Sequence, residues 1–150
     1  MAYSEALTTA VERVQSELHY KSTSRLKTTG TIIDKLHRFG GSNLKHIQDL
    51  AGMRITDDFN LRKQDKIARE LERIFPGSPP AKLIDRRADP RNGYRALHVV
   101  IHVDRIPVGI QVRTRWQHDW ADLYEKFADK FGRGIRYGQL PIESKVIVFR

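Results

Sequence analysis

The sequence predicts an α+β domain with a mixed β-sheet flanked by helices, and three observations support this. Apolar residues recur at helical spacing over residues 4 to 18 and again over residues 62 to 75. Between residues 81 and 114, the three short stretches "AKLIDR", "ALHVVIHVD" and "VGIQVRT" are separated by a loop and a tight turn, as strands are. The expected order of three helices, a strand, a helix, three strands, a helix and a last strand is that of an α+β fold.

The first helix is expected over residues 4 to 18. A second helix follows the hydroxyl-rich stretch "TSRLKTT", with Ile32, Ile33 and Leu36 facing inward and "FGG" as its stop. A short third helix over residues 43 to 51 leads into the strand "MRITD". The N-terminal part of the chain is therefore expected to be mainly helical.

The next part is expected to start with an amphipathic helix over residues 62 to 75, which "PGSPP" ends. The strand "AKLIDR" follows, and the loop "RADPRNGYR" connects it to the strands "ALHVVIHVD" and "VGIQVRT". A tight turn at Arg105 and Ile106 is expected to join those two strands. A helix from residue 116 to residue 131 and a last strand, "KVIVFR", complete the domain.

Length and composition predict a single globular domain over residues 1–150, with 39% apolar and 30% charged residues. No apolar run approaches the roughly 18 to 20 residues that a membrane span needs. The start, "MAYSEALTTA", lacks the pattern of a signal peptide, and the chain has no cysteine. These features predict a cytoplasmic protein without a membrane partner.

The net charge of +9 comes from 27 Lys and Arg against 18 Asp and Glu, and the basic residues are spread along the chain. Such a balance favours a partner that carries phosphates, either a nucleotide or a nucleic acid. The alternative is a solvated basic surface without a specific partner.

One stripe of the predicted second helix carries cations and a hydroxyl. Lys27, Thr31 and Lys35 lie at positions i, i+4 and i+8, and Arg25 precedes them. This arrangement suits a polyphosphate, whose charge is neutralised along its length. An exposed polar helix face would show the same spacing.

A carboxylate stands at the junction between the third helix and the following strand. Asp49 is followed by Gly52 and Arg54. A carboxylate in this position can hold a hard cation such as Mg²⁺ beside phosphates. A helix-capping or surface aspartate is the alternative.

The stretch "RNGYRALH" combines a turn, an aromatic ring and several cations. Asn92-Gly93 is a turn signal, and Tyr94 follows it at the mouth of a strand. The surrounding arginines are Arg87, Arg91 and Arg95. A ring beside guanidinium groups is a stacking platform for a base whose phosphates the arginines hold. The alternative is a core tyrosine with solubilising arginines around it.

The strand "PVGIQVRT" has one apolar and one polar face. Val108, Ile110 and Val112 are expected to point inward, which places Gly109, Gln111 and Arg113 on the other face. The adjacent pair His118-Asp119 lacks further ligands at metal spacing, so a packing or surface role is expected for it. The sequence contains no Gly-rich phosphate loop and no serine or cysteine nucleophile motif.

Taken together, these stretches resemble the synthetase domain of the RelA/SpoT alarmone synthetases, from about Arg25 to Asp122. The segments that carry the resemblance are "RLKTTGTIIDK", "IQDLAGMRI", "RNGYRALH" and "IQVRTRWQHDWAD", in the order in which the family has them. The resemblance implies a nucleotidyltransferase-like mixed sheet with flanking helices. It also implies Mg²⁺-dependent transfer of pyrophosphate from ATP to the 3′-hydroxyl of GDP or GTP, which is the chemistry of a GTP pyrophosphokinase. A counterpart of the family's helical hydrolase domain is not expected within these 150 residues.

The resemblance assigns roles to individual residues. Those implied to bind nucleotide are Arg25, Lys27, Thr31, Lys35, Arg54, Arg87, Arg91, Asn92, Tyr94 and His98. Within this set, Tyr94 is implied to stack on the acceptor base, with Asn92 and His98 shaping its pocket. Asp49 is implied to bind Mg²⁺ and to act in catalysis, together with Gln111 and Arg113.

Two positions depart from the family pattern. Arg91 replaces a lysine, which keeps the charge. Gly109 replaces the glutamate of the family's Glu-x-Gln-x-Arg-Thr strand, and glycine has no side chain that could ligate a metal or accept a proton. Loss of such a carboxylate commonly lowers the rate by about 10² to 10⁴.

Three functions therefore stay open. The first is an alarmone synthetase that is active despite Gly109. The second is a catalytically degenerate homologue that binds nucleotides or has a regulatory role. The third is a basic RNA-binding module, in which RNA or the ribosome would be the partner. A homo-oligomer is compatible with each of them.

Overall fold

The computed structural model describes residues 2–26, 51–90, 93–132 and 134–135. Within these ranges, the helical elements are α1 (Ala2–Arg13), the π-helical turn η1 (Val14–Leu18), α3 (Leu61–Ile74) and α4 (Arg115–Phe131). The strands are β1 (Ser22–Leu26), β2 (Ala51–Asp57), β3 (Lys82–Asp85), β4 (Leu97–Val103) and β5 (Ile106–Thr114).

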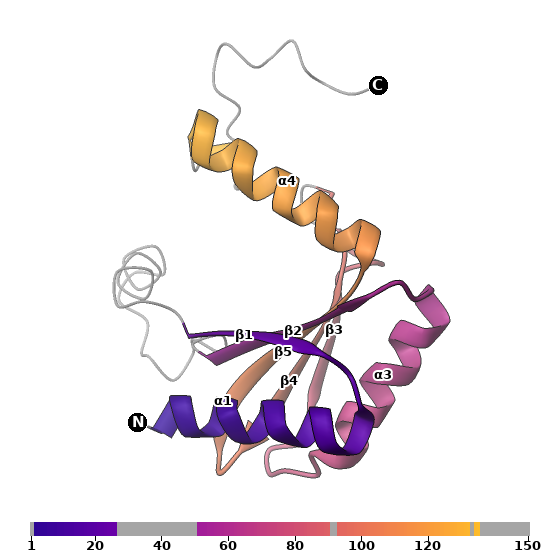
Figure 1. Ribbon diagram of the computed structural model, residues 1–150, viewed down its shortest axis with the longest axis vertical. Helices are drawn as coiled ribbons and strands as arrows, with labels where there is room; N and C mark the ends of the chain where they lie inside the picture. The colour runs from indigo at the N-terminus through magenta and orange to yellow at the C-terminus, as the bar shows by residue number, and fades with distance from the viewer. Residues whose placement is uncertain (1, 27–50, 91–92, 133, 136–150) are drawn as a thin grey trace.

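The described strands form one five-stranded mixed sheet in the order β1-β2-β5-β4-β3 (Figure 1). Strands β2 and β5 are parallel, whereas the pairs β1/β2, β4/β5 and β3/β4 are antiparallel. The predicted α+β fold with a mixed sheet is thus confirmed.

Helices α1 and α3 cover one face of the sheet, and the hydrophobic core lies between them and the strands (Figure 1). Every second residue of the central strands points into this core. The buried strand residues include Met53 and Ile55 of β2, Leu97, Val99 and Ile101 of β4, and Val108, Ile110 and Val112 of β5. The inward face predicted for "PVGIQVRT" is therefore confirmed.

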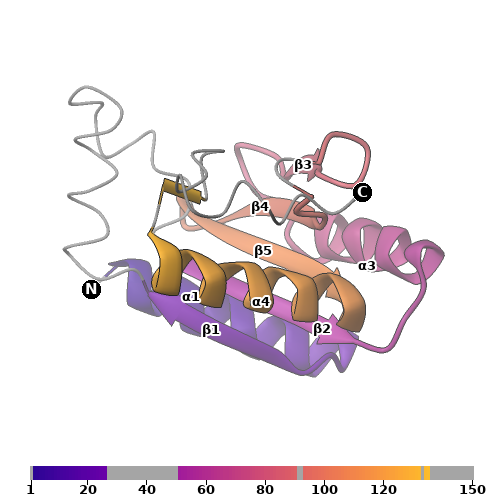
Figure 2. The same cartoon turned by 90° about the horizontal axis from the view of Figure 1, so that it is seen from above.

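Helix α4 lies over β2 and β5 on the side of the sheet opposite α1 (Figure 2). Its buried residues are Ala121 and Ala128, while large apolar side chains such as Trp116 and Leu123 are exposed. Small side chains on the inner face of α4 let its neighbouring polar residues reach the sheet. The sheet surface under α4 is polar because the strands place Arg54, Gln111 and Arg113 on this face.

Two sequence predictions are corrected by the fold. Residues Ser22–Leu26 form an edge strand, which was not predicted because its side chains are mostly exposed and show no apolar alternation. The hairpin turn lies at Asp104 and Arg105, one residue earlier than expected, because Val103 pairs with Ile106. Both turn residues have positive φ, as in a type I′ turn.

Other boundaries shift only slightly. The first helix ends with the π-helical turn at Leu18 and the left-handed residue His19. Strand β2 begins at Ala51, two residues before the predicted "MRITD". The predicted second helix, most of the third helix and the strand "KVIVFR" lie outside the described residues. None of the described helices has the length and apolar character needed to cross a membrane.

Candidate functional site

The polar side chains of the central strands collect on the sheet face that α4 covers. In the register of the sheet, Arg54 is opposite Gln111, and Gln111 is opposite His98. Thr56 is opposite Arg113, and Gly109 is opposite both Gly52 and Val100. The period of two in each strand therefore brings together residues that are far apart in sequence.

Arg113, Tyr94 and His98 form one hydrogen-bonded cluster on this face. The Nη2 atom of Arg113 donates to the hydroxyl of Tyr94 at 2.9 Å, and the same hydroxyl lies 2.9 Å from Nε2 of His98. The guanidinium of Arg113 also lies over the Tyr94 ring, 5.0 Å from its centroid. These contacts fix both the position and the orientation of the Tyr94 ring.

Arg113 is the buried cation of this site. Arg113 is only 3% exposed, yet neither its Nε nor its Nη1 atom has a hydrogen-bond partner in the described part of the chain. Among the described residues, Arg113 also forms no ion pair. A buried guanidinium that lacks a counter-ion and hydrogen-bond acceptors is costly for the folded protein. An anionic ligand at these two nitrogens would remove that cost.

A second guanidinium lies beside the first. Burial lowers the pKa of Arg54, and the positive charge of Arg113 lowers it further, whereas Asp122, Glu125 and Tyr94 act in the opposite direction. The Nε atom of Arg54 is also buried without a partner among the described residues. Two neighbouring arginines with unused N–H groups are suited to bind a phosphate chain.

Helix α4 supplies the side chains that contact Arg54. The Nη1 atom of Arg54 lies 3.5 Å from Nδ1 of His118 and 3.9 Å from Oδ1 of Asp122. His118 and Asp122 are themselves 3.4 Å apart, between Nε2 and Oδ2. His118, for which the sequence predicted a packing or surface role, therefore belongs to the polar site.

Gly93 and Trp120 connect α4 with the turn that carries Tyr94. Gly93 has a φ of +77°, and a Cβ at this position would lie 2.8 Å from Cζ2 of Trp120. Only glycine allows both this backbone conformation and this contact. Trp120 in turn stacks on Tyr124, with ring centroids 4.9 Å apart. The predicted turn at Gly93 is confirmed, and its conformation is coupled to α4.

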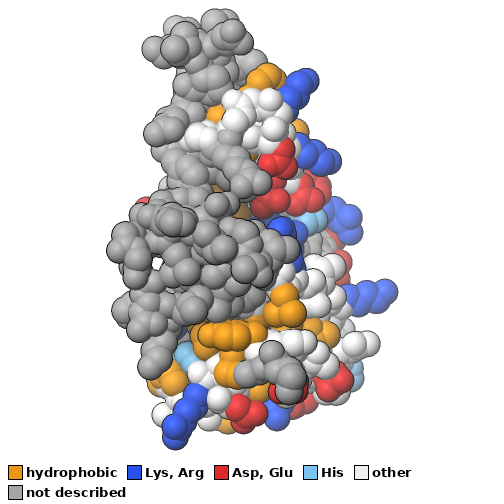
Figure 3. Space-filling view, turned by 90° about the vertical axis from the view of Figure 1, so that its left-hand side faces the viewer, with side chains coloured by type: hydrophobic (Ala, Val, Ile, Leu, Met, Phe, Trp, Pro, Cys, Tyr) orange, Lys and Arg blue, Asp and Glu red, His pale blue; other side chains and the backbone are white. Residues whose placement is uncertain are grey.

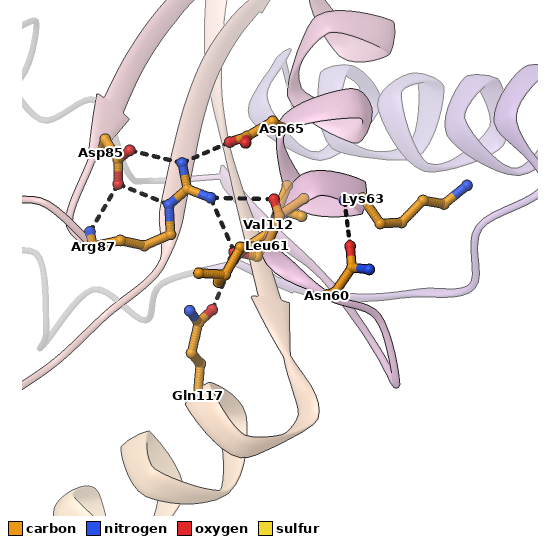
Figure 4. Close-up of polar contacts among 9 residues, drawn as sticks. Asn60, Leu61, Lys63, Asp65, Asp85, Arg87, Val112 and Gln117 are labelled. Carbon is orange, nitrogen blue, oxygen red and sulfur yellow. Dashed lines mark hydrogen bonds and ion pairs between the residues drawn. The ribbon is translucent and has the colours of Figure 1, made fainter.

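Arg87 has a structural role in the described part of the protein (Figure 4). Its Nε donates to Asp85, and its Nη2 donates to Asp85 and Asp65, at distances between 2.6 and 3.0 Å. Its Nη1 donates to the carbonyl of Leu61 and to the side chain of Gln64, both at 3.4 Å. These bonds use all five N–H groups of the guanidinium. In this conformation Arg87 has no free N–H group for the nucleotide contact that the family resemblance implied.

Gln64 was missed by sequence analysis although it connects three elements. Fully buried on α3, it donates from Nε2 to the carbonyl of Val112 and to Oε1 of Gln117, each at 2.7 Å. Gln117 forms a capping box with Thr114 at the start of α4. The sequence does indicate that Gln64 is buried, because Gln64 lies on the apolar stripe of α3 with Ile67 and Leu71.

The Arg87 network makes a testable contribution to acid stability. The hydrogen bonds from Arg87 lower the pKa of Asp85 from 3.8 to about 2. The ionised carboxylate therefore stabilises the fold above the unfolded-state pKa, and this contribution is lost as the pH falls through the folded-state pKa. We expect acidification from about pH 5 to pH 2 to cost the wild type about 1 kcal/mol more than it costs Asp85→Asn, after allowance for solvent screening. Urea unfolding at several pH values measures this difference, and parallel pH profiles of the two proteins would contradict it.

The other predicted site residues divide into two groups. Arg25 lies on β1, opposite Gly52 and next to the polar face, and Arg54, Tyr94, His98, Gln111 and Arg113 lie on or beside that face. Outside the described residues are Lys27, Thr31, Lys35, Asp49, Arg91 and Asn92. Within the described part, no group of three or more acidic or histidine side chains could hold a metal ion.

Comparison with known proteins identifies the class of protein to which this fold and site belong. The sequence model described as "Region found in RelA / SpoT proteins" matches residues 24–130. The chain therefore belongs to the RelA/SpoT family.

The chain is also similar in sequence to mycobacterial proteins. Over 119 residues, the chain is 44% identical to Uncharacterized protein Rv1366 of Mycobacterium tuberculosis strain H37Rv, covering 79% of this chain and 43% of that protein. It thus spans less than half the length of the curated relatives that it matches.

Solved structures share the fold. The small alarmone synthetase 2 of Bacillus subtilis superimposes with a TM-score of 0.69 at 26% identity, covering 95% of this chain and 82% of that chain. The small alarmone synthetase 1 of the same organism, bound to its product pppGpp, gives a TM-score of 0.65 at 21% identity, with coverages of 89% and 82%. The fold of this chain is therefore that of the small alarmone synthetases.

Proposed function

We propose that this chain binds ATP and a guanosine nucleotide on the polar face under α4 and transfers pyrophosphate from ATP to the acceptor's 3′-hydroxyl. The observation that best supports this proposal is the buried guanidinium of Arg113, whose Nε and Nη1 have no hydrogen-bond partner among the described residues. In a member of the RelA/SpoT family, the ligand that best supplies acceptors to this group is a nucleotide phosphate chain.

Different residues of the site would bind the phosphates and the base. Arg113 and Arg54 would hold phosphates, since both keep unused N–H groups within the described structure. A guanine base that stacks on Tyr94 would take the ring face opposite Arg113, because the guanidinium covers the other. Gln111 and His98 lie between these positions in the register of the sheet. The two substrates would thus be held side by side across β2, β5 and β4.

The proposal includes Mg²⁺, which would neutralise phosphate charge and align the reacting groups. Asp49 is the implied ligand and lies outside the described residues. Mg²⁺ in nucleotide enzymes is commonly held by one or two carboxylates together with substrate phosphates and water. A single aspartate next to bound phosphates fits that chemistry, and the described residues offer no competing metal cluster.

A catalytically silent nucleotide-binding protein is the second candidate, and Gly109 favours it. The residues paired with Gly109 are Gly52 and Val100, neither of which has a carboxylate. Asp122 is on the α4 side, but its carboxylate contacts Arg54 and His118. The third candidate, RNA binding, receives less support. On the face shown in Figure 3, the Lys and Arg side chains of the described residues alternate with acidic ones.

Two measurements on the purified chain test the proposal. We expect GDP or GTP and a non-hydrolysable ATP analogue to bind in the presence of Mg²⁺, as measured by calorimetry. We also expect slow formation of a 3′-pyrophosphorylated guanosine nucleotide from labelled ATP, resolved by ion-exchange chromatography. Binding without product would favour the silent homologue, and no binding of either nucleotide would contradict both.

Alanine substitutions of two tyrosines, one in the site and one outside it, provide a matched comparison. Tyr94→Ala should weaken binding of the guanosine nucleotide by about tenfold or more, because one stacked base is worth about 1–3 kcal/mol. Tyr20→Ala removes another half-buried tyrosine, which contacts Glu70 of α3 on the far side of the sheet. It should leave nucleotide binding unchanged. Equal losses in the two variants would show a general effect on the fold instead.

A further inference from the structure

His118 stands between a cation and an anion, with one ring nitrogen toward each. Its Nδ1 lies 3.5 Å from Nη1 of Arg54, and its Nε2 lies 3.4 Å from Oδ2 of Asp122. Asp122 follows His118 by one helical turn, so α4 itself sets their separation. All three side chains are partly buried, with exposures of 29% for Arg54, 28% for His118 and 44% for Asp122.

The two contacts together fit one tautomer of the neutral His118 ring. A guanidinium can only donate, so Nδ1 must be an unprotonated acceptor toward Arg54. A carboxylate can only accept, so Nε2 must carry the proton that points to Asp122. The neutral imidazole with its proton on Nε2 satisfies both contacts. In the protonated imidazolium, an N–H group would face the N–H groups of Arg54.

The side chain of Arg54 needs contacts that hold it in place, because a second cation acts on it. The positive charge of Arg113 acts on it from β5, and its own Nε has no partner among the described residues. Without the contact to α4, the two neighbouring cations would tend to separate. His118 and Asp122 contact Nη1 of Arg54 from α4 and restrain its position.

We propose that His118, oriented by Asp122, is the positioning residue that holds Arg54 ready for a nucleotide phosphate. This inference rests on the proposed function of the same site. It goes further in predicting that nucleotide affinity depends on the contact between Arg54 and His118. His118 contacts Arg54 of β2 and Asp122 of α4, and the other charged or titratable groups that act on Arg54 are Arg113, Tyr94 and Glu125.

Three substitutions of His118 separate positioning from a merely structural role. His118→Asn keeps an acceptor oxygen near the place of Nδ1 and so can still accept from Arg54. His118→Gln places its amide near the position of Nε2, which can meet Asp122 but not Arg54. His118→Leu keeps the volume and removes both contacts. His19→Asn, which alters an exposed histidine at the end of η1, is the control.

Affinity for the Mg²⁺ complex of a non-hydrolysable ATP analogue is measured by calorimetry at about pH 8. We expect the wild type, His118→Asn and His19→Asn to bind within twofold of one another. His118→Leu and His118→Gln should bind about tenfold more weakly, the loss expected for one hydrogen bond to a charged group.

Failure of this inference is distinguishable from failure of the proposed function. If the wild type binds nucleotide while His118→Leu binds equally well, or His118→Asn binds as weakly as His118→Leu, the positioning role is overturned. If the wild type binds no nucleotide, the proposed function fails, and ¹⁵N NMR of the free protein still decides the geometry. The His118 signals, assigned by their absence in His118→Asn, should report a neutral ring protonated on Nε2 at high pH. A ring protonated on Nδ1 would overturn the inference.

Discussion

Replacing Gly109 by glutamate is expected to raise the rate of pyrophosphate transfer by about 10² to 10⁴, the usual contribution of a catalytic carboxylate. Gly109 lies in the middle of β5, on the face that also carries Gln111 and Arg113. Its neighbours in the register are Gly52 and Val100, so a carboxylate introduced here would have no acidic neighbour on the adjacent strands. The measurement is kcat for the labelled product under saturating nucleotides.

Gly109→Gln is the matched control, since it has nearly the size of glutamate but cannot be ionised. It should leave the rate near that of the wild type, and both variants should keep the nucleotide affinity within a few-fold. A rate that rises equally in the two variants would point to packing. If neither variant changes the rate, the missing carboxylate is not what limits this protein.

Replacing Arg113 by methionine is expected to separate binding from stability. The substitution removes the buried guanidinium that we assign to the phosphates, so nucleotide affinity should fall by about 100-fold or more. It should leave the free energy of unfolding unchanged or raise it, because the buried charge has no counter-ion among the described residues. Calorimetry and urea unfolding of the same preparation measure the two effects.

Arg115→Met is the control for net charge, because Arg115 is an exposed arginine at the start of α4. It should weaken nucleotide binding by no more than about twofold, as expected for a screened surface charge. A destabilised Arg113→Met protein that binds nucleotide normally would contradict the assignment. Arg113 would then serve the fold through its hydrogen bond to Tyr94.

Much of the site could be predicted because strand periodicity is local. In β5, alternation alone places Val108, Ile110 and Val112 in the core and Gln111 and Arg113 on the opposite face, as the structure confirms. The amphipathic pattern likewise identified α3, and the Asn-Gly signal identified the turn at Gly93. The order of the motifs along the chain indicated the RelA/SpoT family, which comparison confirms over residues 24–130.

What periodicity cannot predict is which partner a polar side chain finds. Both Arg87 and Arg113 lie in motifs that predict nucleotide binding. The N–H groups of Arg87, however, donate to Asp85, Asp65 and the start of α3. Arg113 instead has two nitrogens without hydrogen-bond partners among the described residues.

By itself, therefore, the sequence determined the family, the two faces of β5, and the presence of α3, α4, β2 and β4, but not the edge strand β1 that carries Arg25. Only the tertiary structure decided that Arg87 belongs to the scaffold, that Gln64 joins α3 to β5 and α4, and that His118 meets Arg54. The physical reason is that side-chain periodicity acts within one element. Hydrogen bonds and ion pairs such as Arg54–His118 instead join residues 64 positions apart, and depend on how the elements pack.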